Sequence, residues 1–429
     1  MFRILLAKRA ITKVQAVVVA AIIIVAAIIG AAAYMSMPVP TPAPTPVATI
    51  KIGCVYSFTG PLSMTGRDAK QILTIAEDWV NGRGGIKSLG GAKINLIWGD
   101  AASDDAKGAA EVERLITEEK VIAIQGCWAS SITATASQVA ERYGVPFICD
   151  VASATELTER GFKWFFRVNP SEYMFAERVD IPFFHWLKEK FNFTVKKLAI
   201  LYENTAYGKS GYEAFTELAD KYGLEVVLAI SYSRATTDVT SEVMKLKSVP
   251  HDALIMYSYI NDAILYVKTF KSLGYKVPLA IVDSGGLNVD FLKALGKDAE
   301  YLFNHAEGYW DMKGLPLLED VTNEMMKRFG VKPNHEQLRE LTAFLVLVDA
   351  IERAGSLEPE KIRDALLRTS FKEGELPVPW GVLFDPTTQQ NVLAGGGIVQ
   401  QIDAEPRTVF PEKYASATIH FPIEGLWPP

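Results

Sequence analysis

The feature that most constrains the fold is a regular alternation of short apolar runs and amphipathic stretches that starts near residue 49. The apolar runs are rich in Val, Ile and Leu, as expected for buried strands. They form two series, 50–56, 94–98, 121–125 and 146–149, then 198–202, 225–230, 253–256 and 279–282. Helical patterns lie between them at 68–81, 105–117, 131–142, 171–190, 209–221, 239–247 and 262–273. This order predicts an α/β protein with two similar lobes, each a parallel sheet flanked by helices.

Composition excludes several classes of protein. With 429 residues the chain has room for two or three domains, and 49% hydrophobic against 22% charged residues excludes disorder over most of it. The net charge of −6 argues against a nucleic-acid partner, because phosphate contacts need clustered Lys and Arg. Three cysteines and five scattered histidines argue against a disulfide-rich scaffold and a His-rich metal site. We expect no metal and no cofactor.

The N-terminal segment, residues 1–35, reads as a signal or a membrane anchor. A basic stretch precedes an uncharged, apolar run at 16–35, which as a helix would span the bilayer core. The basic flank predicts that the rest of the chain lies outside the cytoplasm. Three outcomes stay open: a retained anchor, a pilin-type leader cut before the helix, or a conventional cleaved signal peptide. The protein is thus expected at the cell surface, held by this helix, or secreted.

A linker at 36–49 follows, in which proline alternates with small residues. Alternating proline blocks helices and sheet ladders, so polyproline II is expected. Such a segment is semi-rigid and would act as a stalk that holds a domain away from the membrane.

Small, hydroxyl-bearing and aromatic residues follow the predicted strands of the first series. Trp128, Ser130 and Ser131 come after the third strand and lead directly into a helix, whose N-terminus favours a carboxylate. An ordinary Ser N-cap is the alternative. After the fourth strand, main-chain groups of Val151 and Ala152 and the hydroxyl of Ser153 are candidates to hold an amino-acid head group. Ser153 has a second interpretation, as half of a capping box with Glu156.

Two residues of the second series are candidates of the same kind. Tyr207 lies where a strand turns into a helix and would close over a ligand, or else is a surface aromatic. Asp283 ends a strand just before two glycines and would meet an ammonium group, or else cap the helix near Asn288. Ligands of open α/β sheets bind at the carboxyl ends of strands, so two facing sheets would form a cleft between the lobes.

The order and spacing of five stretches resemble the branched-chain amino acid (Leu/Ile/Val) binding protein family, the type I periplasmic binding proteins of ABC transporters. The stretches are IKIGCVYSFTGPLSMTG, the Asp100–Asp104 turn, GCWASSITATAS, VPFICDVASATELTERGFKWFFRVNPS and LAILYENTAYGKSG. The resemblance implies two Rossmann-like lobes joined by three chain crossings. Lobe 1 would be 50–171 plus 306–392, and lobe 2 would be 172–305 plus 393–429.

The resemblance also implies roles for particular residues. Head-group contacts fall on Ser130, on the main chain of Val151 and on Ser153; the family tyrosine falls on Tyr207. The acid that meets the ammonium group falls near Asp283. Trp128 stands where an apolar side-chain contact is expected, and Tyr259 and Thr65 are further candidates.

Some positions depart from the family pattern. Well-known members have Thr where this chain has Ser153 and Glu where it has Asp283. The first cysteine of a family disulfide is absent, which leaves a bridge between Cys127 and Cys149 to be considered; it needs Cα atoms within about 7 Å. Because Trp128 is large, the ligand stays open between a branched-chain amino acid, another amino acid, and an amide or urea-like compound.

The implied activity is binding without chemistry, followed by delivery to ABC permease subunits in the membrane. An enzyme is disfavoured, since the chain lacks GxGxxG after the first strand, a GxSxG elbow and a zincin motif. A ligand-sensing receptor remains the second alternative.

Overall fold

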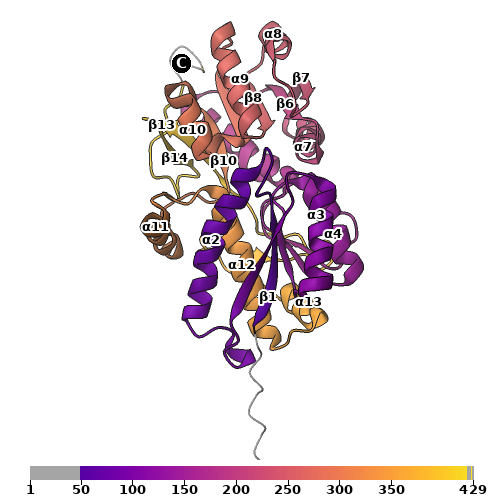
Figure 1. Ribbon diagram of the computed structural model, residues 1–429. Helices are drawn as coiled ribbons and strands as arrows, with labels where there is room; N and C mark the ends of the chain where they lie inside the picture. The colour runs from indigo at the N-terminus through magenta and orange to yellow at the C-terminus, as the bar shows by residue number, and fades with distance from the viewer. Residues whose placement is uncertain (1–48, 423–426, 428–429) are drawn as a thin grey trace, which may run out of the picture. The chain divides into compact units, whose positions relative to one another are not determined.

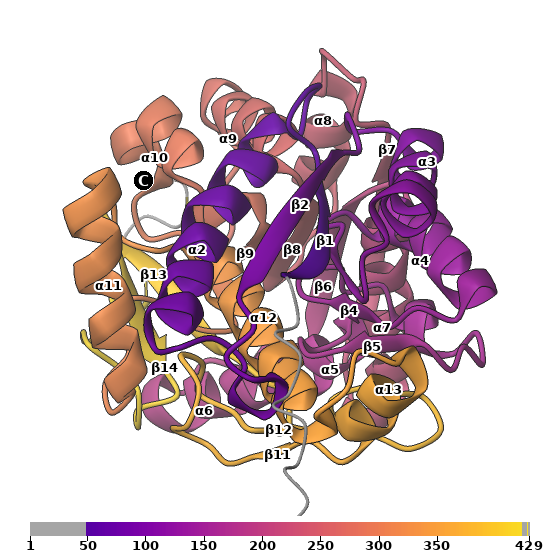
Figure 2. The same cartoon turned by 60° about the horizontal axis from the view of Figure 1, so that its bottom comes forward.

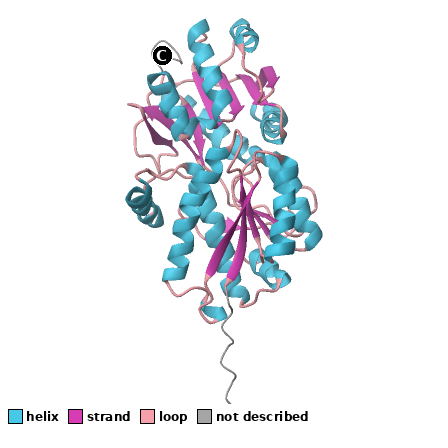
Figure 3. Ribbon diagram, in the orientation of Figure 1, coloured by secondary structure: helices cyan, strands magenta, loops and turns pink. Residues whose placement is uncertain are grey.

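The computed structural model of the chain describes residues 49–422 and 427, which all belong to one compact unit. Two main sheets, each with helices on both faces, make up this unit, and the predicted α/β class is confirmed (Figures 1 and 3). The predicted signal or anchor at 1–35 and the linker at 36–49 lie outside the described residues, apart from Thr49. Within the described ranges, no helix has the length and apolar character needed to cross a bilayer.

The first sheet has five parallel strands in the order β2-β1-β3-β4-β5. Its strand β1 is buried at all but one position, because helices cover both of its faces. β5 was not predicted from the sequence; it is a short FFR run beside β4. The bounds are β1 (Ile50–Tyr56), β2 (Ile94–Asp100), β3 (Ile124–Gly126), β4 (Phe147–Cys149) and β5 (Phe165–Arg167).

Helices from distant parts of the chain cover this sheet. In Figures 1 and 2, α2 lies beside α12 on one side of β1, and α3 lies beside α4 on the other. Helix α13 packs on α12. The bounds are α2 (Ser63–Gly82), α3 (Asp105–Arg114), α4 (Ser130–Tyr143), α12 (His335–Ala354) and α13 (Pro359–Leu367), with short turns η1 (Lys87–Leu89), η2 (Leu115–Glu119) and η3 (Thr155–Thr158). We call the first sheet with these helices the first half.

The second sheet has seven strands in the order β14-β13-β10-β9-β8-β6-β7. Strands β6 to β10 are parallel, whereas β13 and β14 form an antiparallel hairpin at one edge, which the sequence analysis did not predict. Asp403 and Ala404 connect the hairpin, both with positive φ, as tight two-residue turns require. The bounds are β6 (Lys197–Glu203), β7 (Glu225–Tyr232), β8 (Ala253–Ser258), β9 (Leu279–Ser284), β10 (Phe303–Ala306), β13 (Gly397–Ile402) and β14 (Glu405–Phe410).

The second sheet with its own helices is the second half. Helices α8 and α10 each pack on α9, while α7 packs on α5 and η4 of the continuous helical segment α5–η4–α6. The bounds are α5 (Glu172–Phe175), η4 (Ala176–Asp180), α6 (Ile181–Phe191), α7 (Ala206–Tyr222), α8 (Thr240–Ser248), α9 (Ile260–Leu273), η5 (Gly285–Leu287), α10 (Val289–Leu295) and η6 (Gly296–Ala299). Helix α11 (Pro316–Phe329) contacts α2, and a small hairpin pairs β11 (Ser370–Phe371) with β12 (Val382–Leu383).

The two halves are in direct contact. The backbone N–H of Thr155, in the first half, donates to the hydroxyl of Ser210 on α7 at 2.8 Å. Chain segments far apart in sequence also run together, since the Asn391 amide donates to the Val168 carbonyl at 2.9 Å. The lobe boundaries given by the family resemblance stay a prediction, because the described residues form one unit.

Candidate functional site

A small, buried cavity lies where the strand ends of both halves meet. Its lining residues follow β3, β4, β8 and β10, stand at the end of β9, or belong to α5 and α12. Parallel strands place their carboxyl ends at one sheet edge, which explains why separate stretches converge here. The lining consists of Trp128, Val151, Ser153, Phe175, Tyr259, Asp283, Glu307 and Arg339.

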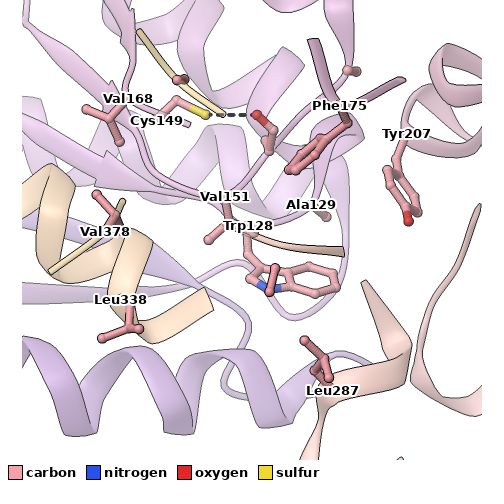
Figure 4. Packing of buried hydrophobic residues seen from close by; sticks show 14 of the residues in the cluster. Trp128, Ala129, Cys149, Val151, Val168, Phe175, Tyr207, Leu287, Leu338 and Val378 are labelled. Atoms are coloured by element: carbon pink, nitrogen blue, oxygen red, sulfur yellow. Dashed lines mark hydrogen bonds between the residues drawn. The ribbon is translucent and has the colours of Figure 1, made fainter. Parts of the chain in front are cut away.

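The first half contributes Trp128, Val151 and Ser153 from the turns after its strands, and Arg339 from α12. Trp128 has φ of 70°, a left-handed conformation that a bulky residue adopts rarely and that concentrates at functional sites. Its side chain is 4% exposed and lies beside Val151 (Figure 4). The carbonyl of Val151 accepts from the Asn169 amide at 2.9 Å, which fixes the loop after β4. The sequence therefore predicted three of the lining residues in this half.

Other predicted residues of the first half lie outside the lining. Ser130 is buried, and its hydroxyl accepts a bond from the Ala154 N–H at 3.2 Å; the N-cap of α4 is Ala129, so Ser130 does not cap its helix. The hydroxyl of Ser131 donates to Asp105 at 2.8 Å, and that of Thr65 to the Leu62 carbonyl at 2.9 Å. The carbonyl of Ala152 accepts from the Cys149 thiol at 3.3 Å.

The second half contributes Asp283, Tyr259, Phe175 and Glu307, and Tyr207 contacts two of them. The hydroxyl of Tyr207 donates to Asp283 Oδ2 at 2.9 Å. The ring of Tyr259 lies 5.2 Å from that of Tyr207 and 5.1 Å from that of Trp128, so aromatic rings bridge the two halves. Asp283 does not cap α10, whose N-cap is Asn288.

A buried histidine stands behind Asp283. His305 Nε2 lies 2.6 Å from Asp180 Oδ1, and His305 Nδ1 lies 3.2 Å from Asp283 Oδ1. The ring of Phe175 stacks on the imidazole, with 5.3 Å between centroids and 5° between planes. Asp180, His305, Asp283 and Tyr207 thus form a connected chain of polar groups, all buried.

This arrangement determines the charges at the site. Burial lowers the pKa of His305, but Asp180 and Asp283 raise it well above its ordinary value, so the imidazole is held protonated. Burial raises the pKa of Asp283, but the charge of His305 and the hydrogen bonds from His305 and Tyr207 bring it below its ordinary value. A charged carboxylate in a buried cavity suits a cationic group of a ligand.

The profile of the periplasmic binding protein family matches residues 49–404. The chain belongs to the periplasmic binding protein family. It is 31% identical over 383 residues to Leu/Ile/Val-binding protein homolog 7 of Brucella suis biovar 1 (strain 1330). The aligned region covers 87% of this chain and 94% of the relative. The predicted family is confirmed.

Solved structures share the fold. The branched-chain amino acid transporter substrate-binding protein LivJ of Streptococcus pneumoniae, in complex with isoleucine, superposes with a TM-score of 0.71 at 22% identity, over 85% of this chain and 100% of that one. A solute-binding protein of an ABC transporter from R. palustris, in complex with benzoate, gives 0.73 at 15% identity, over 86% and 98%. At these identities the likeness establishes the periplasmic binding protein fold.

Further charged residues near the cavity were not predicted from the sequence. Glu307 follows β10, and Arg339 belongs to α12; Arg339 Nη1 forms an ion pair with Glu307 Oε1, and His335 Nδ1 lies 2.7 Å from Glu307 Oε2. Burial raises the pKa of Glu307, but Arg339 and His335 lower it below its ordinary value. Glu172 on α5 is buried, and burial and Asp283 raise its pKa well above the ordinary value. The sequence signal that could have found His335 and Arg339 is the presence of charged residues within the otherwise apolar helix α12.

The considered bridge between Cys127 and Cys149 is not formed. Cys54, Cys127 and Cys149 are all free and buried. The Cys149 thiol instead donates to the Ala152 carbonyl at 3.3 Å, the dashed line in Figure 4. Burial raises the pKa of the Cys149 thiol to about 12, so it stays protonated and unreactive. Among the residues the structure describes, no cluster of His, Cys, Asp and Glu has the geometry of a metal site.

Proposed function

We propose that this periplasmic binding protein binds an amino acid, of the branched-chain type, between its two halves and delivers it to the permease of an ABC transporter. The observation that carries the proposal is one cavity lined by Asp283 from the second half and by Val151 and Ser153 from the first. An α-amino acid carries an ammonium and a carboxylate on one carbon, and this cavity receives an anion from the second half and polar groups from the first.

The second half suits the ammonium group. Asp283 is held charged by His305 and receives the Tyr207 hydroxyl on its other oxygen. Charge-assisted hydrogen bonds of this kind are the strong ones in proteins. The aromatic rings of Trp128, Phe175 and Tyr259 are available to an apolar side chain. The name of the Brucella relative and the isoleucine bound to the S. pneumoniae protein support a branched-chain ligand.

Binding is expected to act through closure of the two halves. The lining residues Trp128 and Tyr259 are only 4% and 5% exposed. A ligand can therefore enter only when the halves separate. A ligand held by both halves favours the closed form by its differential contacts. The closed form then docks on the permease, and ATP hydrolysis belongs to other chains of the transporter.

The family implies an extracytoplasmic location, and the sequence supports attachment. The apolar run at 16–35 would serve as an anchor, or be removed as a signal, and the proline-rich segment at 36–49 would act as a stalk. A retained anchor would keep the binding protein close to its permease.

Isothermal titration calorimetry of the full-length chain in a mild detergent, with each of the twenty amino acids, tests the proposal. We expect binding of Leu, Ile or Val and a loss of at least about 2 kcal/mol of binding free energy in the double variant Ser153→Ala, Asp283→Asn. Ser131→Ala is the matched control, because that hydroxyl bonds to Asp105 outside the cavity. Unchanged affinity in a folded double variant would refute the site, and no binding of any amino acid would refute the proposed ligand class.

A further inference from the structure

The cavity contains a buried cation that the head-group assignment does not use. Arg339, on α12, is 3% exposed and lines the cavity together with Glu307. Its Nη1 pairs with Glu307 Oε1 and lies 3.4 Å from the carbonyl oxygen of Val151. The guanidinium therefore stands next to the loop after β4, where the polar contacts of the first half are.

The guanidinium is only partly satisfied by the protein. Both recorded contacts of Arg339 are made by Nη1, and Nε has no hydrogen-bond partner among the residues that the structure describes. An arginine has five N–H donors in a planar fork, and a buried donor without a partner costs free energy. The edge that Glu307 leaves uncovered has the geometry that binds a carboxylate through two parallel hydrogen bonds.

Glu307 keeps this cation in place. Its Oε1 pairs with Arg339 and its Oε2 lies 2.7 Å from His335 Nδ1, so the carboxylate is held from both sides. Because two partners hold Glu307, its carboxylate fixes the position of the guanidinium, and some N–H donors of the guanidinium stay available. Ser130, by contrast, already accepts the Ala154 N–H and does not line the cavity.

We propose that Arg339 binds the carboxylate of the ligand. This inference rests on the proposed function and narrows its ligand class: the site takes carboxylate anions and discriminates against the matching neutral carboxamides. Asp283, which lines the same cavity from the second half, then selects carboxylates that also carry an ammonium group. An amide or urea-like ligand, one of the alternatives left open by the sequence, leaves the buried guanidinium without a charged partner.

Affinities for acids and their carboxamides test the role of Arg339. Calorimetry of the full-length chain compares L-leucine with L-leucinamide, L-phenylalanine with L-phenylalaninamide, and benzoate with benzamide. For each pair in which binding is detected, we expect the acid to bind about tenfold to a hundredfold more tightly than its carboxamide. This is the range for hydrogen bonds to charged groups. Arg339→Gln should remove this preference, whereas Arg142→Gln, at an exposed arginine paired with Glu113 away from the cavity, should retain it.

The double variant Arg339→Gln, Glu307→Gln guards against misfolding, because it removes both charges of the pair. It should fold and show no acid preference. A carboxamide that binds wild type as tightly as its acid, an acid preference that survives Arg339→Gln, or binding of none of the six probes would overturn this inference. The proposed function falls separately, only if all twenty amino acids fail to bind.

Discussion

Replacing His305 with glutamine probes the electrostatics that keep Asp283 charged. The imidazole lies between Asp180 and Asp283 and stacks on Phe175, and all four side chains are buried. Glutamine keeps a hydrogen-bond donor but removes the positive charge, which leaves two buried carboxylates close to each other. Removal of one partner from a buried ion pair typically costs about 3–5 kcal/mol. We expect His305→Gln to lower the free energy of unfolding by that amount near pH 6.

The pH dependence of this loss gives the sharper test. The pKa of His305 is raised in the folded state, so its contribution to stability is complete below pH 6.5, the ordinary value, and is lost as the pH rises through the folded pKa. Above pH 6.5 the difference between wild type and His305→Gln should shrink, by at most about 1.4 kcal/mol per pH unit. Glu172 also has a raised pKa, but this residue is present in both wild type and His305→Gln and does not distinguish them.

Urea unfolding of the full-length chain, followed by tryptophan fluorescence at pH 6, 7 and 8, measures this difference. His185→Gln, at an exposed histidine, is the matched control and should leave the unfolding free energy unchanged at each pH. The reasoning is refuted if His305→Gln destabilises the protein equally at pH 6 and pH 8, because the imidazole would then be uncharged in the folded state.

Three further predictions concern buried side chains. Tyr207→Phe removes the hydrogen bond to Asp283 and should weaken ligand binding by about 1.5–3 kcal/mol in calorimetry, with an unchanged circular dichroism spectrum; an unchanged affinity would contradict the role of this hydroxyl. Trp128→Ala removes a ring that packs on Tyr259, so unfolding should become easier by about 3–5 kcal/mol and a thermal-shift screen should favour bulkier ligands; an unaltered ligand order would argue against a specificity role. The thiols of Cys54, Cys127 and Cys149 should react with Ellman's reagent only after denaturation, since they are free and buried; rapid reaction of the native protein would contradict their burial.

The strand-end residues could be predicted from sequence because their signal is local. A short apolar run followed by Gly, Ser or Asp marks the end of a parallel strand, and such ends converge in this fold. Trp128, Val151, Ser153 and Asp283 stand in such turns and line the cavity. Tyr259 also lines it, but only the family resemblance pointed to that residue. The hairpin of β13 and β14 was missed, because its strands follow a long stretch without alternation, and β13 joins the sheet only through β10, about a hundred residues earlier in the chain.

The charged residues behind the cavity could not be predicted by the same rule. His305 and Glu307 belong to or follow β10, a strand of four residues that was not recognised, and their partners lie far away in sequence. Arg339 stands within α12, away from the strand-end turns to which this rule applies. Buried charges on an apolar helix are the available clue, but only the structure shows which partner each one meets.

The measurement that tests the central claim most directly is a thermal-shift comparison of wild type and Asp283→Asn, in the full-length chain, with the twenty amino acids, small amides and urea. A ligand at about 100 times its dissociation constant adds roughly 2.7 kcal/mol to the stability of a protein that binds it only when folded. The account predicts a raised melting temperature with Leu, Ile or Val for wild type and none for Asp283→Asn. Equal shifts in the two proteins, or no shift with any amino acid, would contradict amino-acid binding at the cavity between the two halves.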